Sequence, residues 1–252
     1  MTAPAIMRNV RAEWHRAWTV RSTVILVGLT GLGVIGLAAL GASQSASTAP
    51  VGGSPWQLAG FLSLPALLGT LVLVSVLATA DHSTGAIGPT LQWTPRRGIL
   101  LLSRVVTIVV AATGIGVILL TASSAVVWLF APQLTFFASD ALSRIAGVAF
   151  VFAATSLLGV GTGLAVRNTA ATLAVVFALV LVLPLLLQVV PFVWATRIIE
   201  GLPGAGVLFF LLGEGPGNTL MNTASAATTL LVWGTTALAL GSVRLMRSDA
   251  DR

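Results

Sequence analysis

The stretch ATADHSTGAIGPTLQWTPRRG, residues Ala78–Gly98, separates two long apolar runs and decides how the chain is laid out. It combines an acid, a histidine, glycines, prolines and two adjacent arginines. An arginine at the centre of a bilayer costs about 2.5–3.5 kcal/mol on the insertion scale. This stretch therefore lies outside the bilayer, and the apolar runs on either side of it become two consecutive membrane spans.

The composition of the whole chain supports this interpretation. Of the 252 residues, 56% are hydrophobic and 8% are charged, whereas a soluble domain carries about 25% charged residues. The chain has no cysteine, which excludes disulfides and thiolate metal sites. We therefore expect an all-α membrane protein that forms one domain over residues 1–252.

Six segments are long and apolar enough to span, since a span needs about 20 mostly apolar residues. We expect an uncleaved first span, because its apolar run is longer than the core of a signal peptide. The six predicted spans cover residues 22–41, 57–80, 99–130, 144–166, 170–190 and 225–243.

The arginines predict the orientation. All 13 basic residues are arginine, and 11 of them fall before span one, between spans two and three, between spans four and five, or after span six. Only Arg144 and Arg197 fall on the other side. The positive-inside rule then places both termini in the cytoplasm. Because topology accounts for the net charge of +6, we expect no nucleic-acid partner.

The region before span one predicts an amphipathic helix over residues 4–21. Trp14 and Trp18 fall on its apolar face, whereas Glu13 and Arg16 fall on the opposite face. A basic helix with tryptophans on its apolar side is typical of the membrane interface, and Arg21 marks the turn into the first span. The alternative is a disordered positive tail.

The long segment 191–224 between spans five and six contains two apolar pieces that are too short to span. Such pieces favour re-entrant half-helices, and the alternative is an ordinary long loop. Arg197 and Glu200 stand three residues apart, so they can pair on one helical face. We also expect Pro184 to kink span five, and the glycines of spans one and four to serve helix packing.

Motifs for chemistry are missing from the sequence. It has no phosphate-binding loop and no lysine with which to form one. Its two histidines are far apart, and no predicted span has a charged residue at its centre, which argues against an ion-coupled transporter. We therefore predict no catalytic residue, bound cofactor or metal on this chain.

The opening stretch has a local structure of its own. Gly88-Pro89 can begin a short helix, because proline suits the first helical turn, and Thr94-Pro95 ends it. We expect a short cytoplasmic helix within residues 81–98. The alternative is a generic basic loop.

The same stretch resembles the segment between spans two and three of type-2 ABC exporter permeases, particularly the small actinobacterial ones. In that family an acid is followed by Gly-Thr-Ile, Thr-Leu, Pro-x-Arg and a later basic residue. The arm RAEWHRAWTVRST (Arg11–Thr23) is similar to the family's N-terminal arm. This chain departs from the pattern with aspartate in place of glutamate, and with His82, Ala86 and Pro89. The residues that carry the resemblance are Asp81, Gly85, Ile87, Thr90, Leu91, Pro95, Arg97 and Arg104.

The resemblance implies the permease subunit of an exporter in the cell membrane, acting as a dimer with itself or with a homologue. A separate ATP-binding cassette subunit would bind ATP and Mg²⁺. The cargo would be a drug, natural product or lipid, so efflux and antibiotic resistance are implied functions. The ATPase-coupling residues would be Asp81, Thr84, Gly85, Thr90, Leu91, Pro95 and Arg97, and the external gate would include Arg197, Glu200, Phe209 and Phe210.

From the residues alone, three alternatives stay open. These are a secondary transporter or channel that does not use ATP, an intramembrane enzyme, and a passive membrane anchor.

Overall fold

The computed structural model describes residues 3–45, 54–83, 97–132, 134, 138–213, 215–216 and 219–247, and these residues form helices without a strand. Six helical segments are long and apolar enough to cross a membrane, as the sequence predicts. They are α2 (Arg21–Ser45), α3 (Trp56–Ser83), α5 (Arg97–Phe130), α6 (Ala138–Val166), the composite of α7 (Thr169–Phe177), η1 (Ala178–Val182) and α8 (Leu183–Gln188), and α11 (Thr223–Arg247). The six apolar helices suggest a multi-pass membrane protein.

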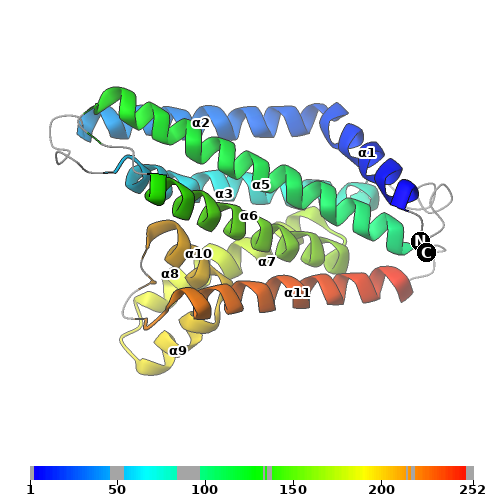
Figure 1. The fold of residues 1–252 in the computed structure, drawn as a ribbon. Coiled ribbons are helices and arrows are strands. Elements are labelled where there is room, and N and C mark those ends of the chain that lie inside the picture. Colours follow the sequence, from blue (N-terminus) through cyan, green and yellow to red (C-terminus); the bar gives the residue numbers. More distant parts are fainter. Residues whose placement is uncertain are drawn as a thin grey trace.

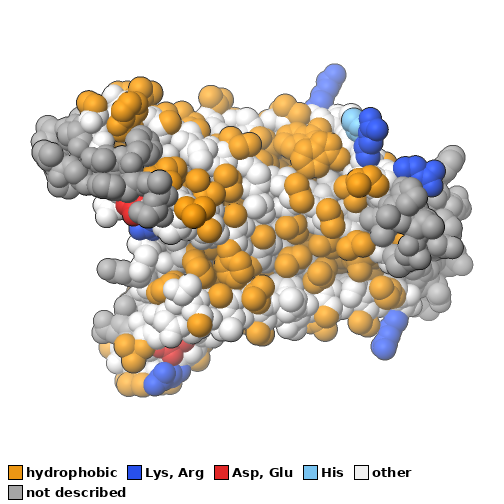
Figure 2. All heavy atoms as spheres, in the orientation of Figure 1, with side chains coloured by type: hydrophobic (Ala, Val, Ile, Leu, Met, Phe, Trp, Pro, Cys, Tyr) orange, Lys and Arg blue, Asp and Glu red, His pale blue; other side chains and the backbone are white. Residues whose placement is uncertain are grey.

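The long helices lie side by side in a bundle, and both ends of the chain lie at the same end of it (Figure 1). We call this the terminal end and the opposite one the far end. A further helix, α1 (Ala3–Thr19), lies at an angle to the bundle at the terminal end. On the face drawn in Figure 2, basic side chains gather at the terminal end, and between the two ends the surface is a mixture of hydrophobic side chains and uncharged groups.

Several helices extend beyond the predicted spans: α2 ends at Ser45 rather than at residue 41, and α11 ends at Arg247 rather than at residue 243. α6 begins at Ala138 rather than near residue 144, with Asp140 in its first turn, where an acid interacts favourably with the helix dipole. α3 continues through Asp81 to Ser83. Hydropathy marks the apolar part of a helix only, so it misses polar turns at the ends.

α6 occupies the centre of the bundle and packs against α3, α5, α7, α10 and α11. Within its apolar stretch 67% of the residues are buried inside the protein, against 11% for α2. Phe152 of α6 is completely buried in the main core, whereas Leu32 of α2 is 75% exposed. An apolar surface of this kind is stable in lipid, so α2 needs no protein neighbour on that side.

Close contact between α6 and α11 depends on glycine. A Cβ atom on Gly161 would lie 2.2 Å from the carbonyl carbon of Ala237, and one on Gly241 would lie 2.4 Å from the carbonyl oxygen of Gly161. No side chain fits at these distances, so the two backbones touch directly. This is the small-residue packing that is typical of membrane helices.

The predicted packing role of the glycines is confirmed for span four, whereas most glycines of span one contact no other helix of this chain. A Cβ on Gly159 would meet Val74 of α3 at 2.7 Å. In α2, by contrast, a Cβ on Gly28, Gly33 or Gly36 would meet nothing within 4 Å. These glycines lie on the exposed side of α2, and the sequence alone cannot distinguish the two situations.

The fifth span is irregular around Pro184, the proline at which we expect a kink. A π-helical segment, η1, precedes it, and Pro184 occupies the first turn of α8. Because proline has no N–H, the carbonyl oxygen of Val180 cannot accept an i→i+4 bond from it. Gly204 lies against that carbonyl, where an added Cβ would be 2.1 Å from the oxygen.

The segment between the fifth and sixth spans forms two short helices, α9 (Val193–Gly201) and α10 (Pro203–Leu212), bent by 81° relative to each other. Pro203 begins α10 at a position that suits proline. Gly213, with φ of 88°, ends it in the left-handed conformation that glycine adopts readily. The sequence therefore correctly predicts two separate apolar pieces here.

The junction of α9 and α10 lies some distance from the far end of the bundle, measured along α11. The indole N–H of Trp233 donates a hydrogen bond to the carbonyl oxygen of Gly201, at 2.7 Å. Trp233 is ten residues beyond the start of α11, which is about 15 Å along a helix. The other end of α10 is at the far end, where Arg144 donates to the carbonyl oxygen of Leu211, at 3.4 Å.

Candidate functional site

The candidate site is a buried group of charges at the terminal end, which joins α1 to the ends of α3 and α5. Asp81 lies in the last turn of α3 and is completely buried. Arg16 of α1 and Arg104 of α5 both donate hydrogen bonds to its carboxylate. Arg16 engages both carboxylate oxygens and Arg104 engages Oδ2, so one carboxylate ties three helices together.

Glu13 completes this group, which we call the charge cluster: Glu13, Arg16, Asp81 and Arg104. The carboxylate of Glu13 lies 3.7 Å from Arg16 and 3.9 Å from Arg104. Two acids and two arginines make the cluster neutral. Neutrality matters because an unpaired charge in a region with little water is strongly unfavourable.

The two arginines differ in their access to water. The side chain of Arg104 is 5% exposed, whereas that of Arg16 is 40% exposed. Burial alone would lower the pKa of Arg16, but its hydrogen bonds and attraction to Asp81, together with the charge of Glu13, raise that pKa. Arg104 is therefore the arginine that needs the carboxylate of Asp81, and Arg16 is the one that can turn to water.

α1 reaches the cluster because the chain bends sharply after it. α1 ends at Thr19 and α2 begins at Arg21, and the N–H of Thr23 donates to the carbonyl oxygen of Val20, at 3.0 Å. On the bundle side of α1, Ala17 is buried, and the hydroxyl of Thr107 in α5 lies 3.5 Å from the carbonyl oxygen of Val10. A cavity of about 70 Å³ lies beside the cluster and is lined by all four helices α1, α2, α3 and α5.

The sequence predicts the polar face of α1 but not what that face contacts. The helical wheel puts Glu13 and Arg16 on a polar face that points away from the membrane side of the helix. In the structure these two residues face the bundle and its buried carboxylate. The physical reason is that α1 rests on the polar end of α3 and α5, so part of its polar face meets protein instead of water.

The two tryptophans of α1, Trp14 and Trp18, lie in its C-terminal half. Trp14 is 38% exposed and Trp18 is partly buried, packing against the main core. Their ring centroids are 5.9 Å apart. Arg21 is the first residue of α2, which confirms the predicted turn at that arginine.

Most of the predicted coupling residues fall outside the described part of the chain. Asp81 belongs to the charge cluster, and Arg97 is the first residue of α5, described for its backbone only. The short helix predicted within residues 81–98 also lies outside the described residues. The same holds for Thr84, Gly85, Thr90, Leu91 and Pro95.

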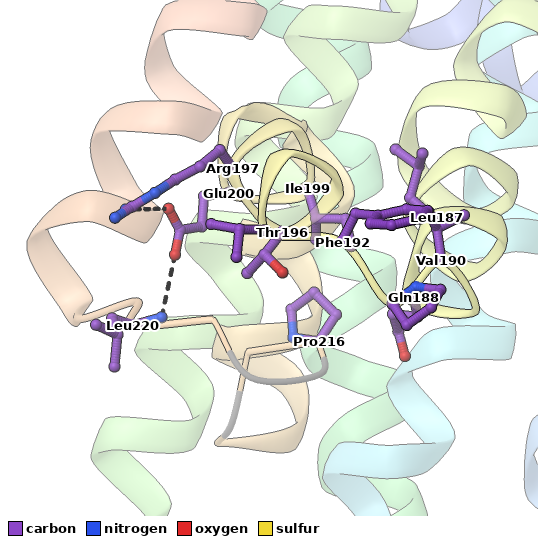
Figure 3. A pocket seen from close by; sticks show the side chains of 12 residues that line it. Leu187, Gln188, Val190, Phe192, Thr196, Arg197, Ile199, Glu200, Pro216 and Leu220 are labelled. Carbon is purple, nitrogen blue, oxygen red and sulfur yellow. Dashed lines mark hydrogen bonds and ion pairs between the residues drawn. The ribbon is translucent and has the colours of Figure 1, made fainter.

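At the far end, the predicted Arg197–Glu200 pair forms within α9, with 3.1 Å between Nη1 and Oε2. Phe209 and Phe210 lie on α10 in edge-to-face contact. Phe210 packs on Phe150 of α6, with ring centroids 5.3 Å apart. Phe210 is thus directed toward α6, and neither phenylalanine lines the cleft beside Arg197 and Glu200 that Figure 3 shows.

The sequence reasoning singled out Asp81 and Arg104 but missed their pairing, and it missed Glu13 and Arg16 as partners. One signal was available. Asp81 ends one predicted span and Arg104 lies one turn and a half into the next, so a hairpin of these spans brings them to similar depths. No comparable signal connects α1 to Asp81, 65 residues away.

Among the described residues, no group of three or more His, Asp or Glu side chains could hold a metal ion. Neither a scan against protein-family models nor a search of curated proteins gives a match for this chain.

Proposed function

We propose that this chain is the membrane-spanning subunit of a type-2 ABC exporter, which forms the translocation pathway as a dimer and is driven by separate ATPase subunits. The resemblance of residues 81–104 and of the N-terminal arm to that family supports the proposal. Six apolar helices and chain ends at the same end of the bundle are compatible with it.

The terminal end is then the cytoplasmic one. The described arginines of α1, at the starts of α2 and α5, after α6 and in the last turn of α11 all belong to this end. Basic residues are retained on the cytoplasmic side of a membrane. The ATPase would approach from there, and residues 84–96 would be its contact.

The charge cluster supports a role in transmitting force from the ATPase to the spans. Asp81 and Arg104 lie on the two helices that flank residues 84–96, and their ion pair joins those helices directly. Arg16 adds α1 to the same carboxylate. A force applied to residues 84–96 would thus move α3, α5 and α1 together, and would not be lost in bending one helix end.

At the external end, α9 and α10 would form a re-entrant pair. The depth of their junction, beside Trp233 and Val180, supports this. With Arg197, Glu200, Phe209 and Phe210 on these helices, the pair would act as an outer gate. The cargo would be a hydrophobic or amphipathic compound, which is suited to a chain that is 56% hydrophobic and only 8% charged.

The test is co-expression of the tagged chain with an ATP-binding cassette ATPase encoded beside it. We expect the ATPase to co-purify, and we expect Leu91→Asp to release it, because a charge would disrupt an apolar contact. Ser47→Asp, on the opposite side of the predicted topology, is the matched control and should retain the ATPase. If the ATPase never co-purifies, or binds the Leu91→Asp variant equally well, the proposal is wrong.

A further inference from the structure

A cleft of about 580 Å³ lies at the far end, between α8, α9, Pro216 and Leu220 (Figure 3). Binding sites for small molecules typically enclose about 300–1,000 Å³ and combine apolar walls with a few polar groups. This cleft has both. Its apolar walls include Leu187, Val190, Phe192, Ile199 and Pro216, and its polar side chains are Gln188, Thr196, Arg197 and Glu200.

The carboxylate of Glu200 has a partner for each oxygen. Oε2 accepts from Arg197 at 3.1 Å, and Oε1 accepts from the backbone N–H of Leu220 at 3.2 Å. The side chain is only 23% exposed. Glu200 is thus held in place at the edge of the cleft, and its charge is already balanced.

Arg197 is in the opposite situation. A guanidinium has five N–H donors, and Arg197 donates one hydrogen bond to the described residues, to Glu200. Its side chain is 72% exposed. An ion pair this exposed contributes little to stability, so Arg197 can turn toward a second anion without loss of structure.

Two further polar groups border the cleft between Arg197 and Leu187. Figure 3 shows Thr196 and Gln188 on either side of Pro216. The side chains of both residues lack a hydrogen-bond partner among the described residues. A hydroxyl, an amide NH₂ and the spare guanidinium donors together give this cleft several hydrogen-bond donors for a ligand.

We propose that this cleft binds an amphiphile with an anionic head group, such as a phosphate or carboxylate. The head group is held by Arg197 and Thr196, and the apolar part lies against the walls formed by α8 and by Phe192. A cationic amphiphile fits less well, because Glu200 is the only acid among the described lining residues, and Arg197 and the N–H of Leu220 already donate to its two oxygens. This site does not depend on the export function proposed above.

The test exploits the lack of cysteine in the chain. A single cysteine introduced by Val193→Cys, at a lining position, carries an environment-sensitive dye. The full chain in phosphatidylcholine nanodiscs is titrated with octyl phosphate and, separately, with octyltrimethylammonium. Trp194→Cys is the matched control. Trp194 is next to Val193 in the chain and is 55% exposed, but it does not line the cleft.

We expect a saturable signal from position 193 with octyl phosphate, and only the non-saturating signal of membrane partitioning from position 194. Arg197→Gln should weaken octyl phosphate binding at least about tenfold, because a hydrogen bond to a charged group is lost. Glu200→Gln should leave this affinity unchanged or increase it, since it frees Arg197. Equal or tighter binding of octyltrimethylammonium, or weaker phosphate binding in Glu200→Gln, would overturn the assignment.

The head group can come from a lipid or from a freely diffusing compound, and nanodiscs containing phosphatidylglycerol distinguish the two. A lipid occupant shifts the dye at position 193 by itself and competes with octyl phosphate. A diffusing compound is indicated when octyl phosphate binds equally in both kinds of nanodisc. If neither probe gives a saturable signal, the proposal is wrong. No ATPase is present, so the result is independent of the exporter test.

Discussion

Neutralising Asp81 should destabilise the protein more than removing either of its arginine partners. In Asp81→Asn, Arg16 and Arg104 remain with Glu13 as their only acid, so the cluster carries a net charge of +1. Arg104 is 5% exposed and has no access to bulk water. Breaking a buried pair in this way costs about 3–5 kcal/mol.

The partner variants should fall in a definite order. Arg16→Gln should cost about 0.2–1 kcal/mol, because Arg16 is 40% exposed and exposed ion pairs contribute little. Arg104→Gln should lie between the two, since Arg16 still compensates Asp81. The double variant Asp81→Asn/Arg104→Gln restores neutrality, so it should be more stable than Asp81→Asn alone.

The assay is equilibrium unfolding of the purified chain by SDS in mixed micelles, followed by the fluorescence of its seven tryptophans. The free energies of unfolding of all four variants are compared with that of the parent chain. If Asp81→Asn costs no more than Arg16→Gln, or if the double variant is less stable than Asp81→Asn, then Asp81 is not the buried counter-charge of Arg104.

Three further outcomes follow from the geometry. Gly161→Ala should cost about 1–3 kcal/mol of unfolding free energy through overpacking, because its Cβ would lie 2.2 Å from the backbone of α11. Gly33→Ala is the control and should not lower stability, since its Cβ would meet nothing within 4 Å. Equal costs of the two variants in the same SDS assay would contradict the close contact. Arg167 has φ of 61°, so Arg167→Gly should be more stable than Arg167→Ala by about 1 kcal/mol, and the reverse order would exclude a left-handed residue there. For the proposed orientation, a cysteine at Ser47 should react with an impermeant maleimide added to whole cells and one at Ser248 should not, and the opposite pattern would reverse the topology.

The positions of the spans could be predicted well because the free energy of placing a helix in lipid is mainly a local sum over its own side chains. Hydropathy therefore locates the cores of all six spans. The span that hydropathy predicts ends before the helix does where the end of the helix is polar. The first turns of α6 and the last turn of α3 around Asp81 therefore lie outside the predicted spans. Pro184 was informative for the same reason, since proline acts on its own backbone.

Partnership between distant residues was not predictable in this way. The helical periodicity of residues 4–21 correctly indicates an amphipathic helix, but it cannot say what the polar face meets. Arg16 could point to water or to protein, and only the bend after Thr19 and the position of α1 across α3 and α5 bring it to Asp81. The glycines of α2 and α6 show the same limit, because both helices are rich in glycine and only the assembled bundle shows which glycines face a neighbouring helix.

The sequence by itself determined that this is a chain of apolar helices and where those helices run, since both follow from local transfer free energies. It also predicts that the stretch between the second and third spans lies outside the bilayer. Only the tertiary structure decided that Asp81, at the start of that stretch, is a buried carboxylate shared by two arginines. It also decided how deep the junction of α9 and α10 lies. The physical reason is that pairing and depth depend on how helices pack against each other, and that is a property of the assembled bundle.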